Sequence, residues 1–409
     1  MPKSNLSRRQ FLAHSAGIAG VSMGLAPVGA GDGRADGRLP SLGIGFIGVG
    51  DRGLQLLRTV CQIRATTPQI RVAAICDVDP KHLRRGLDFA RARHAGRQGR
   101  DGDSPDPSER SSSGSHQQAP QGFTNFRALL DAPGVDAVVI ATPPHLHVTQ
   151  VLTALAAGKN VYCEKPMATS LEDCRAIVSA ADAAEEKGRV FQVGFQRRFN
   201  PRYEKSVQHL RGGNAGPVLF IRSQWHTTSP GSRSKPWLHR QEKSGGIVLE
   251  QASHQFDVFN WIFGGPPLRA CGFGGLSPVL DGPMGRDTLD HYSAVLEYEG
   301  GAKVHMSHLT FAVPERRFSG IQELAFGQHQ GVDLANAAAW NSAGKSESLG
   351  AEKGNETERA VVGFLESVAA GRPSSVGASL GYEAALAALL CQRALDTGKV
   401  ALRQEMESV

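Results

Sequence analysis

Gly48-Val49-Gly50-Asp51-Arg52-Gly53 follows the apolar run 42–47 and precedes apolar residues at helical spacing in 54–60. Three glycines in this pattern, between a strand and a helix, are typical of a turn that binds the pyrophosphate of a dinucleotide. The first glycine permits the sharp turn, the second lets a phosphate approach without meeting a Cβ, and the third lets the helix pack against the strand. The stretch therefore predicts a dinucleotide-binding turn.

A carboxylate supports this interpretation. The apolar segment 72–76 reads as a second strand, and it ends at Asp77, about 20 residues after the glycines, where an acid can accept hydrogen bonds from the adenosine ribose. Asp77 also favours NAD over NADP, because a carboxylate at this place repels the 2′-phosphate. An ordinary glycine-rich turn is the alternative, since the chain has 48 glycines, but the strand, the helix and the acid together disfavour it.

The composition excludes several classes of protein. A chain of 409 residues has room for roughly two to three domains. Lys and Arg number 45 against 39 Asp and Glu, and the basic residues are scattered, so we predict no nucleic-acid surface. The six cysteines lie far apart without metal-ligand spacing, and we therefore predict no metal site and mostly buried thiols.

The N-terminus is of a different kind. Residues 7–12 contain Arg8 and Arg9, the stretch 16–26 is mildly apolar, and 28–30 has the small residues of a cleavage site. This arrangement resembles a twin-arginine export signal over 1–30, with a frayed amphipathic start as the alternative. The apolar stretch is too short for a membrane span, which needs about 20 residues. We therefore expect a mature protein that is periplasmic or otherwise extracytoplasmic, without a membrane contact after removal of the signal.

The rest of the chain predicts two domains. Strand and helix patterns alternate from 41 to 194, which indicates an α/β domain with a parallel sheet, interrupted by a disordered insertion over 96–122 that is rich in Gly, Ser, Pro and charge. Thr169 and Glu172 form a predicted capping box. From 195 to 400 we expect an α+β domain with a largely antiparallel sheet, a long helix over 246–263 and a helical tail.

Two further motifs indicate a family. Ala141-Thr142-Pro143-Pro144-His145-Leu146-His147 and Cys163-Glu164-Lys165-Pro166 each follow a predicted strand, and with the glycine turn they resemble the Gfo/Idh/MocA oxidoreductases over 42–398. The resemblance implies that Lys165 lies beside the nicotinamide and the substrate hydroxyl. An ammonium at the carboxyl end of a parallel strand can steer or deprotonate a hydroxyl, while a surface lysine in a loop is the alternative. The expected cofactor-binding residues are Gly48, Gly50, Asp51, Arg52, Gly53, Asp77, Thr142, Pro143, His147, Glu164 and Lys165.

The segment 244–257 carries the second set of candidates. On a continuous helix Glu250, His254 and Asp257 share one face. The family has a Gly-Gly turn, then an Asp, and a His four residues later at its catalytic centre, so His254 matches and Glu250 replaces the usual Asp. We expect His254 to be the general acid or base with a pKa near neutrality, and Glu250 to orient the substrate or the imidazole. A solvated helix face is the alternative.

The remaining candidates are weaker. Arg197 and Arg198 either reach substrate oxygens or form ion pairs, and the sequence does not choose between them. His145 and His147 open a helix, where capping or shaping of the cofactor site is favoured over catalysis. Tryptophan faces suit sugar CH surfaces but also suit a core. The expected substrate-binding residues are Arg198, Trp225, Trp237 and Asp257.

The sequence as a whole predicts an NAD-dependent oxidoreductase that acts on a secondary hydroxyl of a sugar, polyol or glycoside. An exported protein reaches a compartment without a nicotinamide pool, so we expect a tightly bound cofactor that is recycled within each turnover. One alternative is an NAD-dependent glycosidase or lyase that works through transient oxidation and elimination. Another is a non-catalytic sugar-binding protein with structural NAD. A homo-oligomer is expected from the family resemblance.

Overall fold

The computed structural model describes residues 41–94, 119–228, 235–277 and 285–408. The predicted leader and most of the predicted insertion lie outside the described residues. The end of that insertion is corrected, because Gln121 and Gly122 belong to strand β3 (Gln121–Phe123) and pair with Ala74 and Ile75. Apolar periodicity cannot reveal a strand of three residues at the edge of a sheet.

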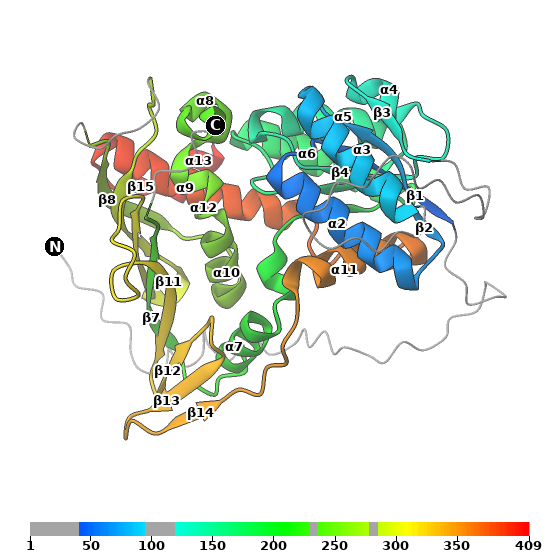
Figure 1. Ribbon diagram of the computed structural model, residues 1–409. Coiled ribbons are helices and arrows are strands. Elements are labelled where there is room, and N and C mark those ends of the chain that lie inside the picture. Colours follow the sequence, from blue (N-terminus) through cyan, green and yellow to red (C-terminus); the bar gives the residue numbers. More distant parts are fainter. Residues whose placement is uncertain (1–40, 95–118, 229–234, 278–284, 409) are drawn as a thin grey trace. The chain divides into compact units, whose positions relative to one another are not determined.

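A six-stranded parallel sheet forms the first part of the fold, in the order β3-β2-β1-β4-β5-β6 (Figure 1). Its central strands are continuous apolar runs that are buried along their length, as both faces of a parallel sheet carry helices. The order reverses between β1 and β4, and ligands bind at such a switch point, beyond the carboxyl ends of the strands. The other strands are β1 (Leu42–Ile47), β2 (Ile70–Cys76), β4 (Ala137–Ile140), β5 (Asn160–Cys163) and β6 (Phe191–Val193).

The helices of this part connect the strands. They are α2 (Asp51–Thr66), α3 (Pro80–His94), α4 (Phe126–Leu130), α5 (His147–Ala156) and α6 (Leu171–Glu185), with the 3₁₀ turns η1 (Pro144–Leu146) and η2 (Gln196–Phe199). The N-cap of α6 is Ser170, whose hydroxyl accepts a hydrogen bond from the Asp173 amide at 3.1 Å. The predicted capping box is therefore one residue out of register.

A nine-stranded sheet forms the second part, in the order β14-β13-β12-β11-β7-β10-β9-β8-β15. All its pairs are antiparallel except β7 with β10, which confirms the predicted largely antiparallel sheet. The strands are β7 (Val218–His226), β8 (Arg269–Gly275), β9 (His291–Glu297), β10 (Lys303–Leu309), β11 (Gly320–Gly327), β12 (Gln330–Asp333), β13 (Ala338–Asn341), β14 (Ser346–Ser348) and β15 (Ala401–Leu402).

Helices pack on this sheet and join it to the first one. The alanine-rich α12 contacts β8, α10 and also α6, so it links the two sheets (Figure 1). Helix α11 contacts α2, and its Phe364 packs edge-on against Tyr162 of β5 at 5.8 Å between ring centroids. These helices and turns are α7 (Pro201–Arg211), η3 (Pro236–His239), α8 (Gln241–Ser244), α9 (Gly246–Glu250), α10 (Ser253–Phe263), η4 (Glu299–Gly301), α11 (Glu356–Ala370), α12 (Ala378–Thr397) and α13 (Arg403–Glu407).

The predicted single helix over 246–263 is wrong in one respect. It is broken at Gln251 and Ala252 into α9 and α10. Gly245 caps α9 and Gly246 is its first residue; both have positive φ, +74° and +78°, which favours glycine, and a Cβ on Gly246 would lie 2.4 Å from the Gln241 side-chain oxygen.

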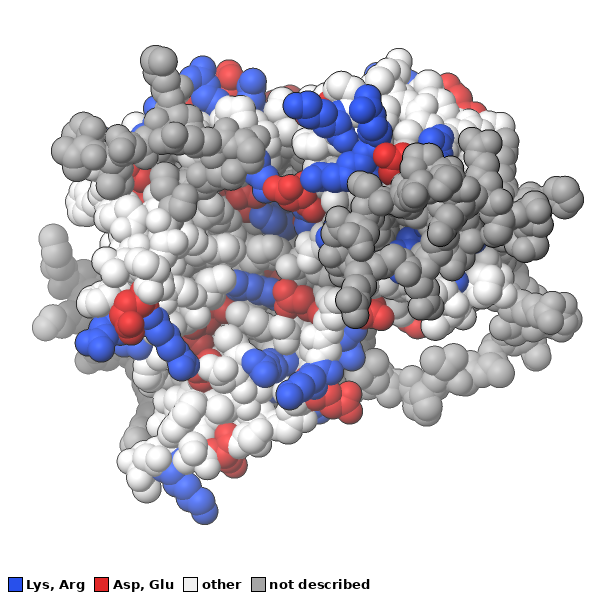
Figure 2. Space-filling view, viewed as in Figure 1, with Lys and Arg blue, Asp and Glu red and all other residues white. Residues whose placement is uncertain are grey.

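Charges are mixed over the visible surface. Among the described residues on the face shown in Figure 2, basic and acidic side chains lie interspersed. This distribution gives no support to a nucleic-acid surface on that face. No helix of the described residues is long and apolar enough to cross a membrane.

Candidate functional site

The turn after β1 has the backbone that a phosphate cradle requires. Gly48 has φ +86°, and a Cβ there would lie 2.8 Å from the Ala141 carbonyl oxygen. A Cβ on Gly53 would lie 2.0 Å from the Gly48 oxygen, so both positions exclude larger residues. A Cβ on Gly50, by contrast, would lie no closer than 3.9 Å to His82, so the space beside Gly50 is open to an approaching phosphate. The residues present therefore fit a dinucleotide.

Asp77 lies at the carboxyl end of β2 and is tied to this turn. Its Oδ2 accepts a hydrogen bond from the Val49 amide at 2.8 Å, and its Oδ1 accepts one from the Asp79 amide at 2.9 Å. Each carboxylate oxygen can accept a second bond. The side chain is thus held beside the turn with capacity left for ribose hydroxyls.

Arg52 and Glu164 bond to each other. Arg52 Nε donates to Glu164 Oε1 at 2.8 Å, and the guanidinium also donates to the side chains of Gln196 and Thr357. Glu164 is only 5% exposed. The pair links the phosphate turn to the Glu-Lys-Pro turn, so the geometry favours a positioning role over the direct cofactor contact that the sequence suggested for each.

His147 is fully buried, and it holds two loops together. Its Nδ1 and Nε2 each lie 2.9 Å from a backbone carbonyl oxygen, those of Pro166 and Thr142. Burial lowers the pKa of His147. This placement fits the shaping of the cofactor site that the sequence favoured for His147, without a direct contact with the cofactor, whereas Thr142 and Pro143, on the loop after β4, remain partly exposed.

Lys165 follows β5, in a turn with a cis Lys165–Pro166 bond. Its Nζ donates a hydrogen bond to Glu250 Oε1 at 3.0 Å and another to the Glu250 backbone carbonyl. The two side chains keep 13% and 17% of their surface exposed. Two motifs that are distant in the sequence thus meet at an ammonium–carboxylate pair that solvent can still reach.

His254 lies close by, at the beginning of α10. It is 8% exposed, and its Nδ1 has no hydrogen-bond partner among the described residues. Burial first, and then the charges of Lys165 and Arg197, hold the pKa of His254 well below its usual value. The prediction of a pKa close to neutral pH is therefore corrected. The surrounding protein disfavours the cationic form, so the imidazole is uncharged.

The break between α9 and α10 changes the predicted arrangement of the acids. Glu250 ends α9 and faces Lys165, so its carboxylate orients the lysine. The sequence predicted instead that Glu250 orients the substrate or the imidazole. Asp257 is 1% exposed, and both its oxygens accept hydrogen bonds from Arg198 Nε, at 2.9 and 3.0 Å. Burial raises the pKa of Asp257 to about 6, while Arg198 opposes this shift.

Both arginines left open by the sequence form ion pairs. Arg198 pairs with Asp257, and Arg197 pairs with the fully buried Glu323 at 2.6 Å. The geometry therefore favours a structural role for Arg198 and Asp257, in which they hold η2 against α10, over the predicted contact with substrate.

The two predicted tryptophans lie in different surroundings. Trp225 is half-buried on β7, where its ring stacks on His308 at 5.8 Å and the Arg197 guanidinium lies 5.6 Å from its centroid. Burial lowers the pKa of His308 to about 3, and its Nε2 lies 2.8 Å from Gln251 Oε1. Trp237 belongs to η3, is also partly exposed, and directly precedes the pocket residues Leu238 and His239.

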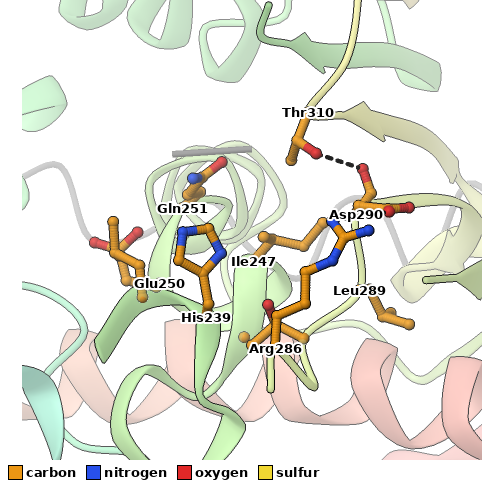
Figure 3. Close-up of a pocket in the computed structure, with 11 residues that line it drawn as sticks. His239, Ile247, Glu250, Gln251, Arg286, Leu289, Asp290 and Thr310 are labelled. Atoms are coloured by element: carbon orange, nitrogen blue, oxygen red, sulfur yellow. Dashed lines mark hydrogen bonds and ion pairs between the residues drawn. The ribbon is translucent and has the colours of Figure 1, made fainter. Parts of the chain in front are cut away.

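A narrow polar pocket opens beside Glu250 (Figure 3). Seven polar side chains line it, from η3, α9, the break after α9 and the segment 286–310: His239, Glu250, Gln251, Arg286, Thr288, Asp290 and Thr310. His239 is 3% exposed, and its Nε2 has no hydrogen-bond partner among the described residues. Glu250 belongs both to this pocket and to the pair with Lys165, so the pocket adjoins that pair.

No sequence motif marks this pocket. Arg286 pairs with Asp290 at 3.4 Å, and Thr310 Oγ1 donates to the Asp290 carbonyl at 3.1 Å. These residues lie in connecting segments without a motif, and only the fold brings them to His239. No group of His, Cys, Asp and Glu suited to a metal occurs in the part of the chain that the structure describes.

Comparison with known proteins identifies the family. Residues 42–195 match the oxidoreductase family with an NAD-binding Rossmann fold, and residues 203–323 match the GFO/IDH/MocA C-terminal domain. The chain belongs to the Gfo/Idh/MocA oxidoreductase family. The predicted α/β class, with a Rossmann domain followed by a domain with a largely antiparallel sheet, and NAD as the cofactor of the family are confirmed.

Individual relatives match parts of the chain. The scyllo-inositol 2-dehydrogenase (NAD(+)) of Bacillus subtilis is 29% identical over 176 residues, 42% of this chain and 48% of the relative. A 1-carboxy-3-chloro-3,4-dihydroxycyclohexa-1,5-diene dehydrogenase of Comamonas testosteroni is 27% identical over 66% of this chain and 58% of the relative. The chain thus spans about half the length of these curated relatives.

A solved structure covers more of the chain. The aldose-aldose oxidoreductase of Caulobacter crescentus matches with a TM-score of 0.69 and 21% identity, covering 88% of this chain and 99% of that one. At this identity the likeness shows the fold alone.

Proposed function

We propose that the protein is an NAD-dependent oxidoreductase that acts on a secondary hydroxyl of a sugar, polyol or glycoside. The observation that carries this proposal is the 3.0 Å contact between Lys165 Nζ and Glu250 Oε1, on the side of the sheet where the dinucleotide turn lies. The polar side chains of the pocket beside Glu250 are groups that can form hydrogen bonds with a hydroxyl. The relative from Bacillus subtilis is named for a cyclic polyol, which supports this substrate class.

The chain's own residues can manage the proton of that hydroxyl. When bound, NAD supplies the acceptor for a hydride from the carbinol carbon. Lys165 donates a hydrogen bond to the hydroxyl oxygen and stabilises the negative charge that develops there. Glu250 fixes the ammonium in place, and the neutral His254 is in the form that can accept a proton.

A single-turnover experiment tests this function. Purified protein, loaded with NAD, is mixed with inositols, aldoses and glycosides while nicotinamide absorbance and sugar release are followed. We expect reduction of the bound cofactor by at least one of these compounds. Release of a sugar without net NADH would support the glycosidase alternative instead. Bound NAD with no redox change for any compound would support the sugar-binding alternative.

We also propose that the protein is exported with its cofactor already bound, which would require recycling of NAD within each turnover. The support is the sequence of residues 7–30. Replacing Arg8 and Arg9 by Lys should leave the protein in the cytoplasm with its leader uncut. Fractionation that shows the variant outside the cytoplasmic membrane would contradict the proposal.

A homo-oligomer is proposed from the second sheet. One face of this sheet exposes apolar side chains: Phe220 on β7 is 38% exposed, Phe326 on the adjacent β11 is 41% exposed, and Val295 on β9, on the far side of β10, is 36% exposed. The Phe220 and Phe326 rings lie 6.3 Å apart, so the apolar surface is continuous across β7 and β11. A surface of this kind is typical of a protein–protein contact, and a second copy of the chain would cover it. Light scattering of the purified protein measures its oligomeric state directly.

A further inference from the structure

The phosphate turn contains Asp51, which was predicted to bind the cofactor but whose negative charge opposes a pyrophosphate. Asp51 lies in the first turn of α2, directly after Gly50, and its side chain is 63% exposed. The N-terminus of a helix attracts anions, but a carboxylate at this place repels a pyrophosphate. A cation nearby would remove this conflict.

Lys235 supplies such a cation from the other part of the fold. Its Nζ lies 2.8 Å from Asp51 Oδ2, and the hydrogen bond and charge of Lys235 lower the pKa of Asp51. The lysine side chain is 35% exposed. An ion pair this exposed contributes little to stability, so by itself it leaves the lysine free to exchange partners.

The segment 235–245, which we call the strap, contacts the first part of the fold at a second place. Lys243 lies in α8, and its backbone carbonyl is 3.2 Å from His145 Nδ1. His145 belongs to η1, which follows β4, whereas Asp51 follows β1. The strap therefore contacts the loops after both strands of the switch point, where the dinucleotide binds.

The strap is also fixed to the second part of the fold. The Gln241 amide donates to Asp287 Oδ1 at 2.7 Å, and the Asp287 amide donates to the His239 carbonyl at 3.1 Å. Within the strap, Ser244 Oγ donates to the Leu238 carbonyl at 3.1 Å. These bonds give the strap a defined shape, with Lys235 at the end that meets the phosphate turn.

We infer that Lys235 binds the pyrophosphate of the cofactor and that this bond must break before the dinucleotide can leave. The inference rests on the dinucleotide site, and it deepens the proposal of a retained cofactor. The two negative charges of a pyrophosphate beside Asp51 attract Lys235 more strongly than Asp51 alone does. Release of the cofactor then requires the breaking of a charge-assisted hydrogen bond in addition to the contacts within the first part of the fold.

The test is the rate at which NADH leaves the full-length protein. NADH is displaced by excess NAD in a stopped-flow instrument, and energy transfer from the four tryptophans to NADH is followed. Lys235→Met should speed release by about tenfold to a hundredfold, the effect of one charge-assisted hydrogen bond. Lys243→Met is the matched control, because it removes an exposed charge from the strap and keeps the backbone contact with His145; its rate should be that of the wild type.

A double variant separates binding of the pyrophosphate from simple neutralisation of Asp51. If Lys235 only cancels that charge, Asp51→Asn restores the wild-type rate to Lys235→Met. The inference predicts that the double variant still releases NADH fast. Restoration by Asp51→Asn, or an unchanged rate in Lys235→Met, would overturn it. Hydride transfer is not part of this measurement, so slow, Lys235-dependent release from a protein without dehydrogenase activity would contradict the proposed function and leave the inference standing.

Discussion

The phosphate turn and the region around Lys165 are built in different ways. The turn is fixed by its own backbone, because a Cβ on Gly48 or on Gly53 would collide with backbone atoms beside it. The region around Lys165 has no such local cause. Lys165, Glu250 and His254 meet only because β5, α9 and α10 are packed together. The comparison teaches that cofactor binding should tolerate changes that abolish catalysis.

The largest expected effect separates the two regions directly. Lys165→Met and His254→Ala should each lower the rate of hydride transfer by about 10² to 10⁴, the usual contribution of a positioned acid or base. Because both act on one proton transfer, the double variant should be impaired much less than the product of the two effects. Single-turnover nicotinamide absorbance measures the rates, and bound dinucleotide should remain near that of the wild type.

The control for this prediction is Lys187→Met, which removes an exposed charge between α6 and β6. Its rate should equal that of the wild type. Equal rates in all three variants would mean that the chemistry takes place elsewhere in the protein.

The second prediction concerns the ion pair between Arg198 and Asp257, which holds η2 against α10. Arg198→Ala should lower the free energy of unfolding by about 3 to 5 kcal/mol at pH 8, because it leaves a buried carboxylate without its partner. The loss should be smaller at pH 5, since burial raises the pKa of Asp257 to about 6 and the unpaired acid then takes up a proton. Denaturant unfolding at the two pH values measures both quantities.

Arg202→Ala is the matched control, because Arg202 is exposed on α7. It should leave stability nearly unchanged. An Arg198→Ala protein of wild-type stability that binds substrate poorly would instead support the direct contact with substrate that the sequence suggested.

The smallest expected effect lies in the cofactor region. Asp77→Ala should weaken the preference for NAD over NADP by about tenfold, because it removes a hydrogen-bond acceptor for the ribose and a charge that repels the 2′-phosphate. Total affinity should also fall, since Asp77 accepts a bond from the Val49 amide in the turn. Binding titrations with both cofactors give the ratio, with the exposed Asp88→Ala as the control. An unchanged ratio would remove Asp77 from the cofactor site.

The difference between the regions also explains what the sequence could predict. The alternation of strands and helices, the glycine turn and the position of Asp77 depend on residues close in sequence, and the structure has them as expected. Lys165 and His254 were found through motifs that resemble a family. The uncharged state of His254 was not predicted, because its pKa depends on burial and on charges from distant segments.

The other features that the sequence did not predict also depend on contacts between distant segments. The pairing of Arg198 with Asp257, the pocket around His239 and the contact of Lys235 with Asp51 each join segments that no motif connects. The break between α9 and α10 falls in a run of good helix formers, where local propensity gives no signal for it.

Transfer of deuterium to the cofactor tests the central claim most directly. The protein is loaded with NAD and given inositols and aldoses that carry deuterium on every carbinol carbon, and the nicotinamide is then analysed by mass spectrometry. The account predicts that wild-type protein places one deuterium on the nicotinamide and that Lys165→Met, with its NAD still bound, does so at least about 100-fold more slowly. Deuterium transfer at the wild-type rate in Lys165→Met, or none from any compound in the wild type, would contradict it.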